Sequence, residues 1–500
     1  MTRAPFCWLA CAAGALGAAL ACAAPDRPAP AASIRSAGEA IYRRGVLPSG
    51  APLVGQREAG ATVEGMEAAC VRCHRRSGLG AMEGRGSSVP PISGLYLFKP
   101  RSHDDNDLPF VESMRAERDP YTEATLARAT PSRIARASVI TPDADPVKRA
   151  AMLDVLTQYF SDKNAAYRNT APRLRSGRPV MFRVTRRWQL HVWELSGAPD
   201  TWEAQLEAHL KQEPVFAVIS GIGGRSWAPV HRFCERAELP CLMPNVELPD
   251  TAPDDVYTVY FSRGVLLEAE LIAHDLDARD AKASRIVQVF RAGDVGEPAA
   301  EALAAAVRPS GVTVVNRRLP AKGGKLGNAL AGLAAGDARV LWLRPADLSQ
   351  LAKLPAPAGP VYLSGLMGEL EDAPLPPAWR PVTRMPYLFD LPDERRVRLD
   401  YQHGWFVARK IKVASLRTQS DTFLACGLLA ETLSHMVDAF QRDYLIERLD
   451  DSVEHRILTG YYPRLSLGIG QSFGSKGGYI VHFAGPEGTK LARDSDWIVP

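Results

Sequence analysis

From about residue 134 onward the sequence alternates between apolar, β-branched runs and segments with helical periodicity. The runs "IARASVIT", "WQLHVWELSG" and "PVFAVISGIGG" are predicted strands, and "DPVKRAAMLDVLTQYFSDKNA" and "TWEAQLEAHLKQ" are predicted helices between them. Strands that are apolar on both faces and alternate with helices form parallel sheets covered by helices on both sides. This alternation therefore limits the larger part of the chain to an α/β fold.

A second series of the same kind follows the segment "YTVYFSRGVLLEAELIAHDL". Its predicted strands are "SRIVQVF", "GVTVVNRRL", "ARVLWLR" and "PVYLSGL", and its predicted helices are "EPAAEALAAAV", "LGNALAGLAAG" and "ADLSQLAKL". Two consecutive parallel sheets predict two lobes. Open α/β sheets bind ligands beyond the carboxyl ends of their strands, so we expect a small molecule to bind where the lobes face each other.

Five residues in the loops at those strand ends are candidates for contacting such a ligand. Backbone amides around Ser220 and Gly221, at a predicted helix start, suit a carboxylate, and Trp227 suits an apolar ligand group. Asn245 and Arg344 offer further polar contacts. Each also has a structural explanation, because glycines at a strand end often serve only the turn and Trp227 can pack inside its lobe.

A separate motif precedes this region, the string "CVRCH" formed by Cys70, Cys73 and His74. Two thiols at this spacing reach the two vinyl groups of a porphyrin, and the following imidazole binds the iron from one face. The alternatives are a redox CxxC, a disulfide or half of a zinc site. A second CxxC and a strand-to-helix setting are both missing from the sequence, which disfavours the zinc and redox alternatives. The motif predicts one covalent haem c.

The segments around this motif resemble a class I cytochrome c. "SIRSAGEAIYRRGVLPSG" resembles its N-terminal helix, "DPYTEATLARA" is a further predicted helix, and the residues between form a glycine-rich loop. The resemblance implies an all-α haem domain over residues 34–133, shortened because the methionine loop and closing helix have no residues left. Met114 is the preferred sixth ligand, ahead of Met82 and His103, and an iron with five ligands or with water is the alternative.

The first residues have the pattern of a secretory signal peptide, predicted over 1–24 and followed by a linker at 25–33. Lipidation at Cys22 is the less favoured alternative. No later stretch has about 18 uninterrupted apolar residues, so the mature chain is expected to be soluble in the periplasm. In that oxidising compartment Cys234 and Cys241 form either a disulfide or two unpaired buried thiols.

Charge and motif content exclude several functions. The 60 Lys and Arg residues nearly balance the 56 Asp and Glu residues, giving a net charge of +4 without a long block of like charges, so no nucleic-acid partner is expected. Walker, HExxH and GxSxG motifs are absent from the sequence, and we predict that the protein is not an enzyme. The helical segments "RLDYQHGWFVARKI" and "CGLLAETLSHMVDAF" are expected to pack in the core.

Residues 134–500 resemble the type I periplasmic solute-binding proteins, on "VITPDADP", "LPCLMPN", "YTVYFSRG" and "SLGIGQSFGSKGGYIVHF". With the haem motif, the whole chain resembles bacterial proteins in which a cytochrome c is fused to an ABC-transporter substrate-binding domain. The leading hypothesis is a periplasmic electron-transfer accessory, in which the haem carries an electron and the two-lobed region binds a small solute or docks to a partner such as a quinoprotein dehydrogenase. The alternatives are an ABC-type uptake receptor with a vestigial haem domain and, third, a peroxidase.

Overall fold

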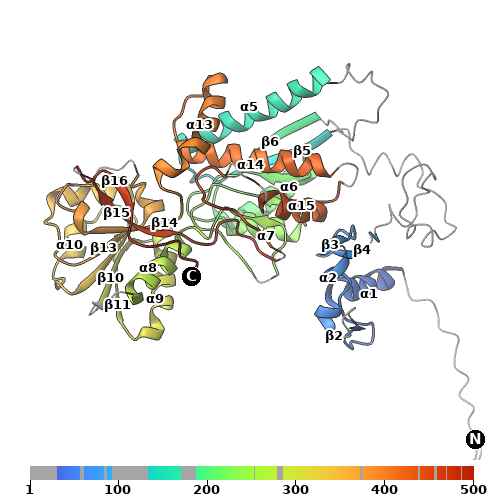
Figure 1. The fold of residues 1–500 in the computed structure, drawn as a ribbon, viewed down its shortest axis with the longest axis horizontal. Helices are drawn as coiled ribbons and strands as arrows, with labels where there is room; N and C mark the ends of the chain where they lie inside the picture. The colour runs from blue at the N-terminus through green and yellow to red at the C-terminus, as the bar shows by residue number, and fades with distance from the viewer. Residues whose placement is uncertain are drawn as a thin grey trace, which may run out of the picture. The chain divides into compact units, whose positions relative to one another are not determined.

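The computed structural model describes most of the chain. The described residues are 31–56, 61–83, 87–89, 91–92, 133–170, 187–252, 254–278, 285–371, 375–436, 440–454, 456, 459–468, 470–485 and 487–500. The chain divides into two compact units, Met1–Pro90 and Pro91–Pro500 (Figure 1).

Several predictions fall outside the described residues. They are the signal peptide with Cys22, most of the linker, the helix expected near residue 119, His103 and Met114. The predicted boundary between 133 and 134 adjoins this part of the chain. All of these stay predictions.

The first unit combines two helices with two β-hairpins. Its elements are α1 (Ala31–Arg44), α2 (Val71–His74), β1 (Val54–Gln56) paired antiparallel with β2 (Thr62–Glu64), and β3 (Ala81–Glu83) paired antiparallel with β4 (Ser87–Val89). The expectation of an all-α domain is therefore wrong for the described residues. Helix α2 is short because Arg75 leaves the helical region, with φ of 60° and ψ of 174°, and β-branched residues favour the β1–β2 pairing.

The first lobe of the second unit is built on a five-stranded parallel sheet. Its strands are β5 (Arg133–Ile140), β6 (Arg187–Glu194), β7 (Ala217–Ile219), β8 (Cys241–Leu242) and β9 (Thr258–Val259), in the order β6-β5-β7-β8-β9. The helices that follow β5, β6 and β7 are α5 (Pro146–Thr170), α6 (Trp202–Gln212) and α7 (Ala228–Arg236). The predicted strand and helix alternation is confirmed here.

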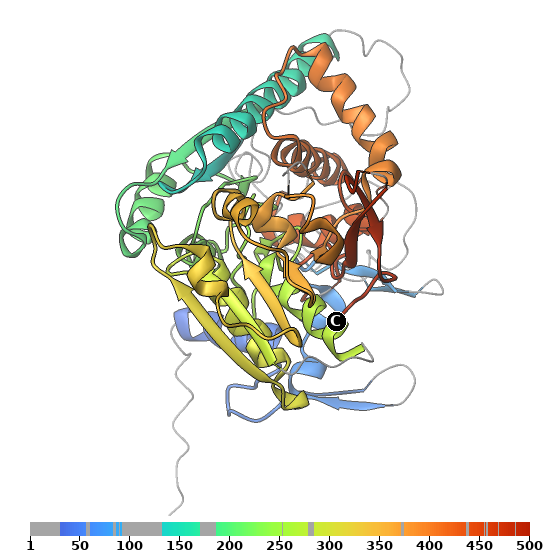
Figure 2. The same ribbon diagram turned by 90° about the vertical axis from the view of Figure 1, so that its left-hand side faces the viewer.

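The second lobe has a seven-stranded sheet in the order β11-β10-β12-β13-β14-β15-β16 (Figure 2). Its strands are β10 (Arg285–Arg291), β11 (Thr313–Leu319), β12 (Asp337–Trp342), β13 (Val361–Leu363), β14 (Thr383–Tyr387), β15 (Tyr479–Ala484) and β16 (Lys490–Arg493). Its helices include α8 (Val265–Ala278), α9 (Gly296–Ala306), α10 (Leu326–Leu330), α11 (Pro345–Leu348) and α12 (Gly365–Gly368). The expectation of wholly parallel sheets needs correction, because β15 and β16 run antiparallel to their neighbours.

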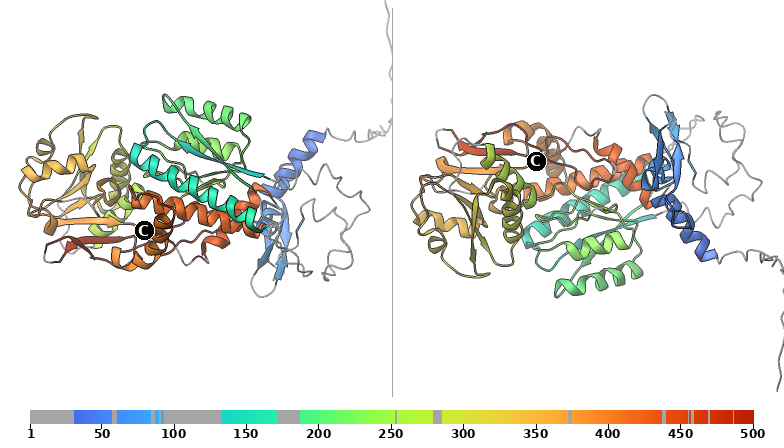
Figure 3. Two further views of the ribbon diagram at one scale, coloured as in Figure 1. Left: turned by 90° about the horizontal axis from the view of Figure 1, so that it is seen from above. Right: turned by 90° about the horizontal axis from the view of Figure 1, so that it is seen from below.

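Three late helices follow β14: α13 (Pro392–Ala408), α14 (Leu416–His435) and α15 (Arg442–Glu454). Helix α14 packs along α5 of the first lobe (Figure 3), and α15 joins the same lobe through Arg442, which donates to the Val215 carbonyl at 2.8 Å. Both α14 and α15 therefore return the chain to the first lobe.

Helix α13 lies at the outside of the unit (Figure 2) and only partly meets the expectation of core packing. Phe406 is fully buried, but the side chains of Val397, Tyr401 and Val407 are 73%, 62% and 63% exposed. The helical spacing predicted an apolar face on this helix, and the rest of the fold buries only the part of that face around Phe406.

A disulfide joins Cys234 and Cys241, whose Cα atoms are 6.2 Å apart. It connects the end of α7 to the start of β8, in the core of the first lobe. The unpaired-thiol alternative does not describe this structure.

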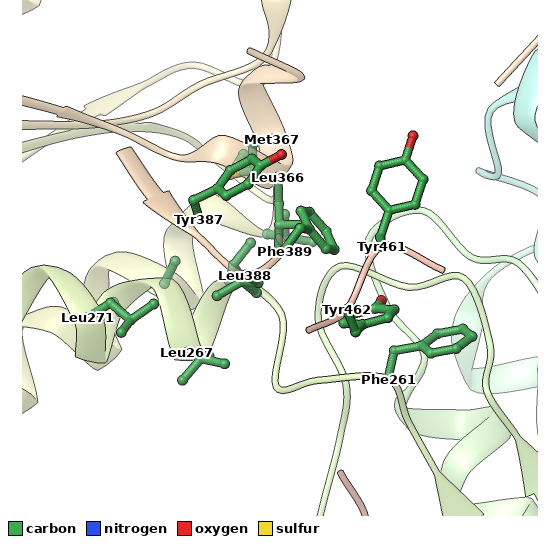
Figure 4. Packing of buried hydrophobic residues seen from close by; sticks show 14 of the residues in the cluster. Phe261, Leu267, Leu271, Leu366, Met367, Tyr387, Leu388, Phe389, Tyr461 and Tyr462 are labelled. Atoms are coloured by element: carbon green, nitrogen blue, oxygen red, sulfur yellow. The ribbon is translucent and has the colours of Figure 1, made fainter. Parts of the chain in front are cut away.

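The chain passes between the two lobes at three places, and aromatic rings bring these crossings together (Figure 4). Phe261 follows β9 and stacks on Tyr462 with ring centroids 5.3 Å apart. Phe389 follows β14 and meets Tyr462 edge-on at 5.4 Å. Gly264, in the first crossing, has φ of +58° and lies so close to the Glu247 carbonyl that a Cβ would stand 2.1 Å from it.

None of the described helices combines the length and apolar character needed to cross a membrane.

Candidate functional site

The strand order places a topological switch point in each lobe. In the first lobe β5 lies between β6 and β7, and in the second lobe β10 lies between β11 and β12. In each sheet the next strand in sequence is therefore added on one side of the middle strand and the strand after that on its other side. The loops after β5 and β7 and those after β10 and β12 line a single cavity of about 580 Å³. The cavity therefore lies where two sets of carboxyl strand ends meet, as the sequence predicts.

Two carboxylates near the rim hold the loops of the first lobe. Asp143 accepts hydrogen bonds from the backbone amides of Gly224 at 3.3 Å and Arg225 at 2.7 Å. Asp145 accepts from the amides of Val147 and Lys148, both at 2.9 Å, and so caps α5. These carboxylates shape the wall and are already hydrogen-bonded.

Ion pairs connect the two lobes across the cavity. Lys148 of the first lobe pairs with Glu369 of the second. Arg344 of the second lobe pairs with Glu247 of the first at 2.7 Å and with Asp294 of its own lobe at 2.9 Å. Burial alone lowers the pKa of the Arg344 guanidinium, but the two carboxylates outweigh it and raise that pKa overall. We call Lys148–Glu369 and Arg344–Glu247 the cross-lobe pairs.

The first two turns of α14 contribute Arg417, Thr418 and Asp421 to the cavity. Asp421 is only 6% exposed, and its Oδ1 atom has no hydrogen-bond partner among the described residues. Burial raises the pKa of Asp421 to about 7, although the positive charges of Arg417 and Arg395 act in the opposite direction.

Arg417 lies in the same part of the cavity. Its guanidinium carbon is 5.6 Å from the centre of the Phe389 ring, and no described residue accepts a hydrogen bond from it. Burial acts to lower its pKa, but the negative charges led by Asp421 and Glu247 raise it overall, so Arg417 stays cationic.

Of the five residues predicted to contact a ligand, Asn245 and Arg344 line the cavity. The Asn245 amide donates to the Ser220 hydroxyl at 3.0 Å, and Arg344 is engaged by carboxylates. Both residues reach the cavity while making contacts within the protein.

The other three candidates lie beneath the cavity wall. Ser220 is fully buried and donates to the Thr422 hydroxyl at 3.1 Å. A Cβ on Gly221 would stand 2.5 Å from the Trp227 ring, and Trp227 is 2% exposed in the core of the first lobe. Close packing accounts for these three residues.

Sequence reasoning missed the residues of the cavity that come from the late part of the chain. They are Phe389, Arg417, Asp421 and Tyr462. One available signal was the pair Arg417 and Asp421, four residues apart just before the apolar run "FLACGLLA", a spacing that places both charged side chains on one face of a helix.

The described residues contain one group with the composition of a metal site: His231, Glu235 and Asp255. The Glu235 carboxylate already accepts hydrogen bonds from the amides of residues 256–258 at 2.8 to 2.9 Å. His231 contacts Asp255 at 3.1 Å and the Tyr260 hydroxyl at 2.8 Å. The group thus ties α7 to the segment leading into β9.

In the first unit, the predicted haem-attachment residues lie on one helical turn. Cys70 precedes α2, Cys73 is exposed within it, and His74 ends it, with its amide donating to the Cys70 carbonyl at 2.9 Å. Neither thiol is in a disulfide. Helix α1 supports the turn through the Tyr42 hydroxyl, which donates to the Arg75 carbonyl at 2.6 Å.

The second unit is similar in structure to solved binding proteins. A substrate-binding periplasmic protein from Ralstonia solanacearum aligns with a TM-score of 0.54 and 12% identity over 72% of this chain and 100% of that one. A fatty acid ABC transporter substrate-binding protein from Thermomonospora curvata aligns with a TM-score of 0.52 and 13% identity over 74% and 94%. A branched-chain amino acid transporter substrate-binding protein from Streptococcus pneumoniae, in complex with isoleucine, aligns with a TM-score of 0.51 and 12% identity over 74% of this chain and 100% of that one.

No protein-family model matches the chain, and no curated protein matches its sequence. At this low identity the likeness concerns the fold alone: the second unit has the two-lobed fold of these binding proteins.

Proposed function

We propose that the second unit binds a small solute between its lobes and acts as the receptor of an ABC-type uptake system in the periplasm. The observation that carries this proposal is the cavity of about 580 Å³ between two facing sets of carboxyl strand ends. The volume suits a small molecule, and the three crossings between the lobes and the cross-lobe pairs suit a receptor that closes over its ligand.

The charge arrangement supports binding rather than catalysis. Glu247, Asp294 and Glu369 are engaged in ion pairs, and Asp143 and Asp145 hold backbone amides. Most ionisable groups in the walls are thus occupied in fixing geometry, and the Tyr260 hydroxyl is held by His231.

The test is ligand-induced stabilisation of the purified protein. A solute at 100 times its Kd stabilises the folded state by about 2.7 kcal/mol and raises Tm accordingly. A panel of amino acids, alcohols and small organic acids is expected to contain members that raise Tm, and Ala144→Trp, which fills the cavity, abolishes the rise. Ala305→Trp on the exposed end of α9 is the matched control.

The proposal fails if no member of the panel raises Tm. It also fails if Ala144→Trp and Ala305→Trp respond to the active solute as the unmodified protein does, since binding would then lie outside the cavity.

We propose as a second function that the first unit carries one covalent haem c, which Cys70 and Cys73 would attach through thioether bonds and His74 would hold as a ligand of the iron. The supporting observation is that both thiols, neither of them in a disulfide, lie on the turn that ends in His74. The residues therefore fit the group. When bound, a haem supplies a one-electron redox centre; Tyr42 and α1 then hold the attachment turn in place. A periplasmic dehydrogenase is the proposed redox partner, and Met114 the proposed sixth ligand.

Expression together with a cytochrome c maturation system tests this function. We expect haem absorbance that survives acid–acetone extraction and is lost in the variant with both Cys70→Ser and Cys73→Ser. Cys426→Ala, which changes a buried cysteine of the other unit, is expected to keep the colour. A colourless exported protein excludes the haem and leaves the solute-binding proposal intact.

A further inference from the structure

Two charged side chains inside the cavity take no part in holding its walls. Asp421 is buried with an unpartnered Oδ1 atom, and no described residue accepts a hydrogen bond from Arg417. They lie four residues apart on α14, so both project from the same face of the helix. Burying polar atoms without partners costs free energy, so this arrangement indicates that a ligand supplies them.

An apolar surface adjoins these two groups. Four apolar or aromatic residues line the same cavity: Phe389, Leu366, Met367 and Tyr462. They lie near the crossings between the lobes (Figure 4). Leu366 and Met367 come from α12 of the second lobe, whereas Arg417 and Asp421 come from α14 of the first. A ligand held by the charged pair therefore places the rest of its body against apolar side chains.

The remaining carboxylates of the cavity are occupied. Glu247 and Asp294 face Arg344, Glu369 faces Lys148, and Asp143 holds backbone amides, as does Asp145. An ammonium group would have to pair with Asp421 itself, beside the like charge of Arg417. While Asp421 is protonated, the charge of Arg417 therefore favours an anion over a zwitterion.

We propose, building on the solute-binding function above, that the cavity takes a small monocarboxylate with an apolar body and no ammonium group. Its carboxylate is held by the Arg417 guanidinium and by the Asp421 carboxyl, and its body lies against Phe389 and the α12 residues Leu366 and Met367.

The protonation of Asp421 gives this proposal a pH signature. Burial raises the pKa of Asp421 to about 7, so below that pH its carboxyl can donate a hydrogen bond to the ligand. The charged and titratable groups facing it are Arg417 on α14, Arg395 on α13, and Tyr461 and Tyr462 in the segment after α15. The arginines stay cationic, and burial raises the pKa of each tyrosine, so among these five groups only Asp421 titrates between pH 5.5 and 8.5. Glu268, which accepts a hydrogen bond from the Leu366 amide and has its pKa raised to about 8, also titrates in this range, so Asp421→Asn identifies the part of the pH dependence that belongs to Asp421.

Ionised Asp421 repels a carboxylate and attracts an ammonium. A monocarboxylate should therefore bind more weakly as the pH rises through about 7, by up to about tenfold per pH unit, whereas an amino acid should bind more tightly.

Calorimetry on the full chain at pH 6 and pH 8.5 tests the proposal with phenylacetate, isovalerate, L-phenylalanine and 2-phenylethanol. We expect phenylacetate or isovalerate to bind at pH 6 at least about tenfold more tightly than L-phenylalanine and 2-phenylethanol, and to weaken at pH 8.5. Arg417→Gln should weaken the acid by at least about tenfold, and Asp421→Asn should remove the pH dependence. Arg396→Gln, on the exposed face of α13, should change neither.

Tighter binding of L-phenylalanine, strengthening with pH, overturns the inference and leaves the solute-binding function standing. Equal binding of 2-phenylethanol overturns the carboxylate contact. If no probe binds, but another solute stabilises the protein and Ala144→Trp abolishes that stabilisation, the monocarboxylate inference alone is wrong. If no solute stabilises the protein in this manner, both the inference and the solute-binding function are wrong. Should Arg417→Gln not fold, the ligand ranking and pH slope of the unmodified protein decide the question.

Discussion

Glu268 is a residue whose burial sets a pH dependence of stability. It lies fully buried on α8, where the Ser364 hydroxyl and the Leu366 amide donate to its carboxylate oxygens. Burial raises its pKa from 4.5 to about 8 and outweighs the effect of these hydrogen bonds. The folded protein therefore keeps a proton that the unfolded chain loses between these values, so this residue makes stability fall as pH rises from 4.5 to 8.

Glu268→Gln should flatten that dependence, because an amide remains neutral and can still bond Ser364 and Leu366. At about 1.4 kcal/mol per pH unit, the difference from the unmodified protein at pH 8 is at most about 5 kcal/mol in favour of the variant. Urea unfolding at pH 5 and pH 8 measures it. Glu301→Gln on α9, where the side chain is exposed, is the control; identical pH slopes for the three proteins would contradict the assignment.

At the scale of residues, the sequence correctly predicted a cavity at the carboxyl ends of the strands, but only two of the five candidate residues line it. Asn245 and Arg344 follow strands directly, and their place at the strand ends could be inferred from the apolar runs before them. Trp227 has the same position in the pattern, but whether such a ring points into the cavity or the lobe depends on packing that a sequence does not contain. Arg417 and Asp421 could not be placed, because the return of α14 to the first lobe is a tertiary event.

Among the elements, α13 shows how the same helical spacing produces two different environments. Phe406 is fully buried and meets Phe423 edge-on at 6.2 Å, whereas Tyr401 is 62% exposed. Phe406→Ala should lower the free energy of unfolding by about 3 to 5 kcal/mol, and Tyr401→Ser should change it by less than about 0.5 kcal/mol. Denaturant unfolding compares the two.

A large loss of stability in Tyr401→Ser would show that the outer face of α13 is covered in solution. A small loss in Phe406→Ala would show that the contact with Phe423 forms only in part.

Long apolar helices and strands could be predicted from the sequence, whereas short helices and strands that pair with a distant part of the chain could not. β10 and α5 follow directly from their periodicity. The helix expected over "LGNALAGLAAG" ends at Leu330, since Ala331 is extended and Gly332 has φ of +68°. Three helices separate β14 from β15 in the chain, yet β15 pairs antiparallel with β14, and β16 pairs antiparallel with β15. Local sequence contains no information about that pairing.

For the whole second unit, the cross-lobe pairs should control closure. Each is partly exposed, so each contributes about 1 kcal/mol or less, and its loss should weaken solute binding by up to about fivefold. Arg344→Gln and Lys148→Gln are expected to increase the radius of gyration of the ligand-free protein in small-angle scattering. Arg285→Gln breaks a pair with Asp337 inside one lobe and should leave both quantities unchanged; an equal response in that variant would contradict the role of the cross-lobe pairs.

The last 30 residues belong to both lobes at once. Phe473 forms a parallel β-bridge with Tyr260 of the first lobe, and β15 and β16 complete the sheet of the second lobe. A ribosome must therefore release nearly the whole polypeptide before either half can finish folding.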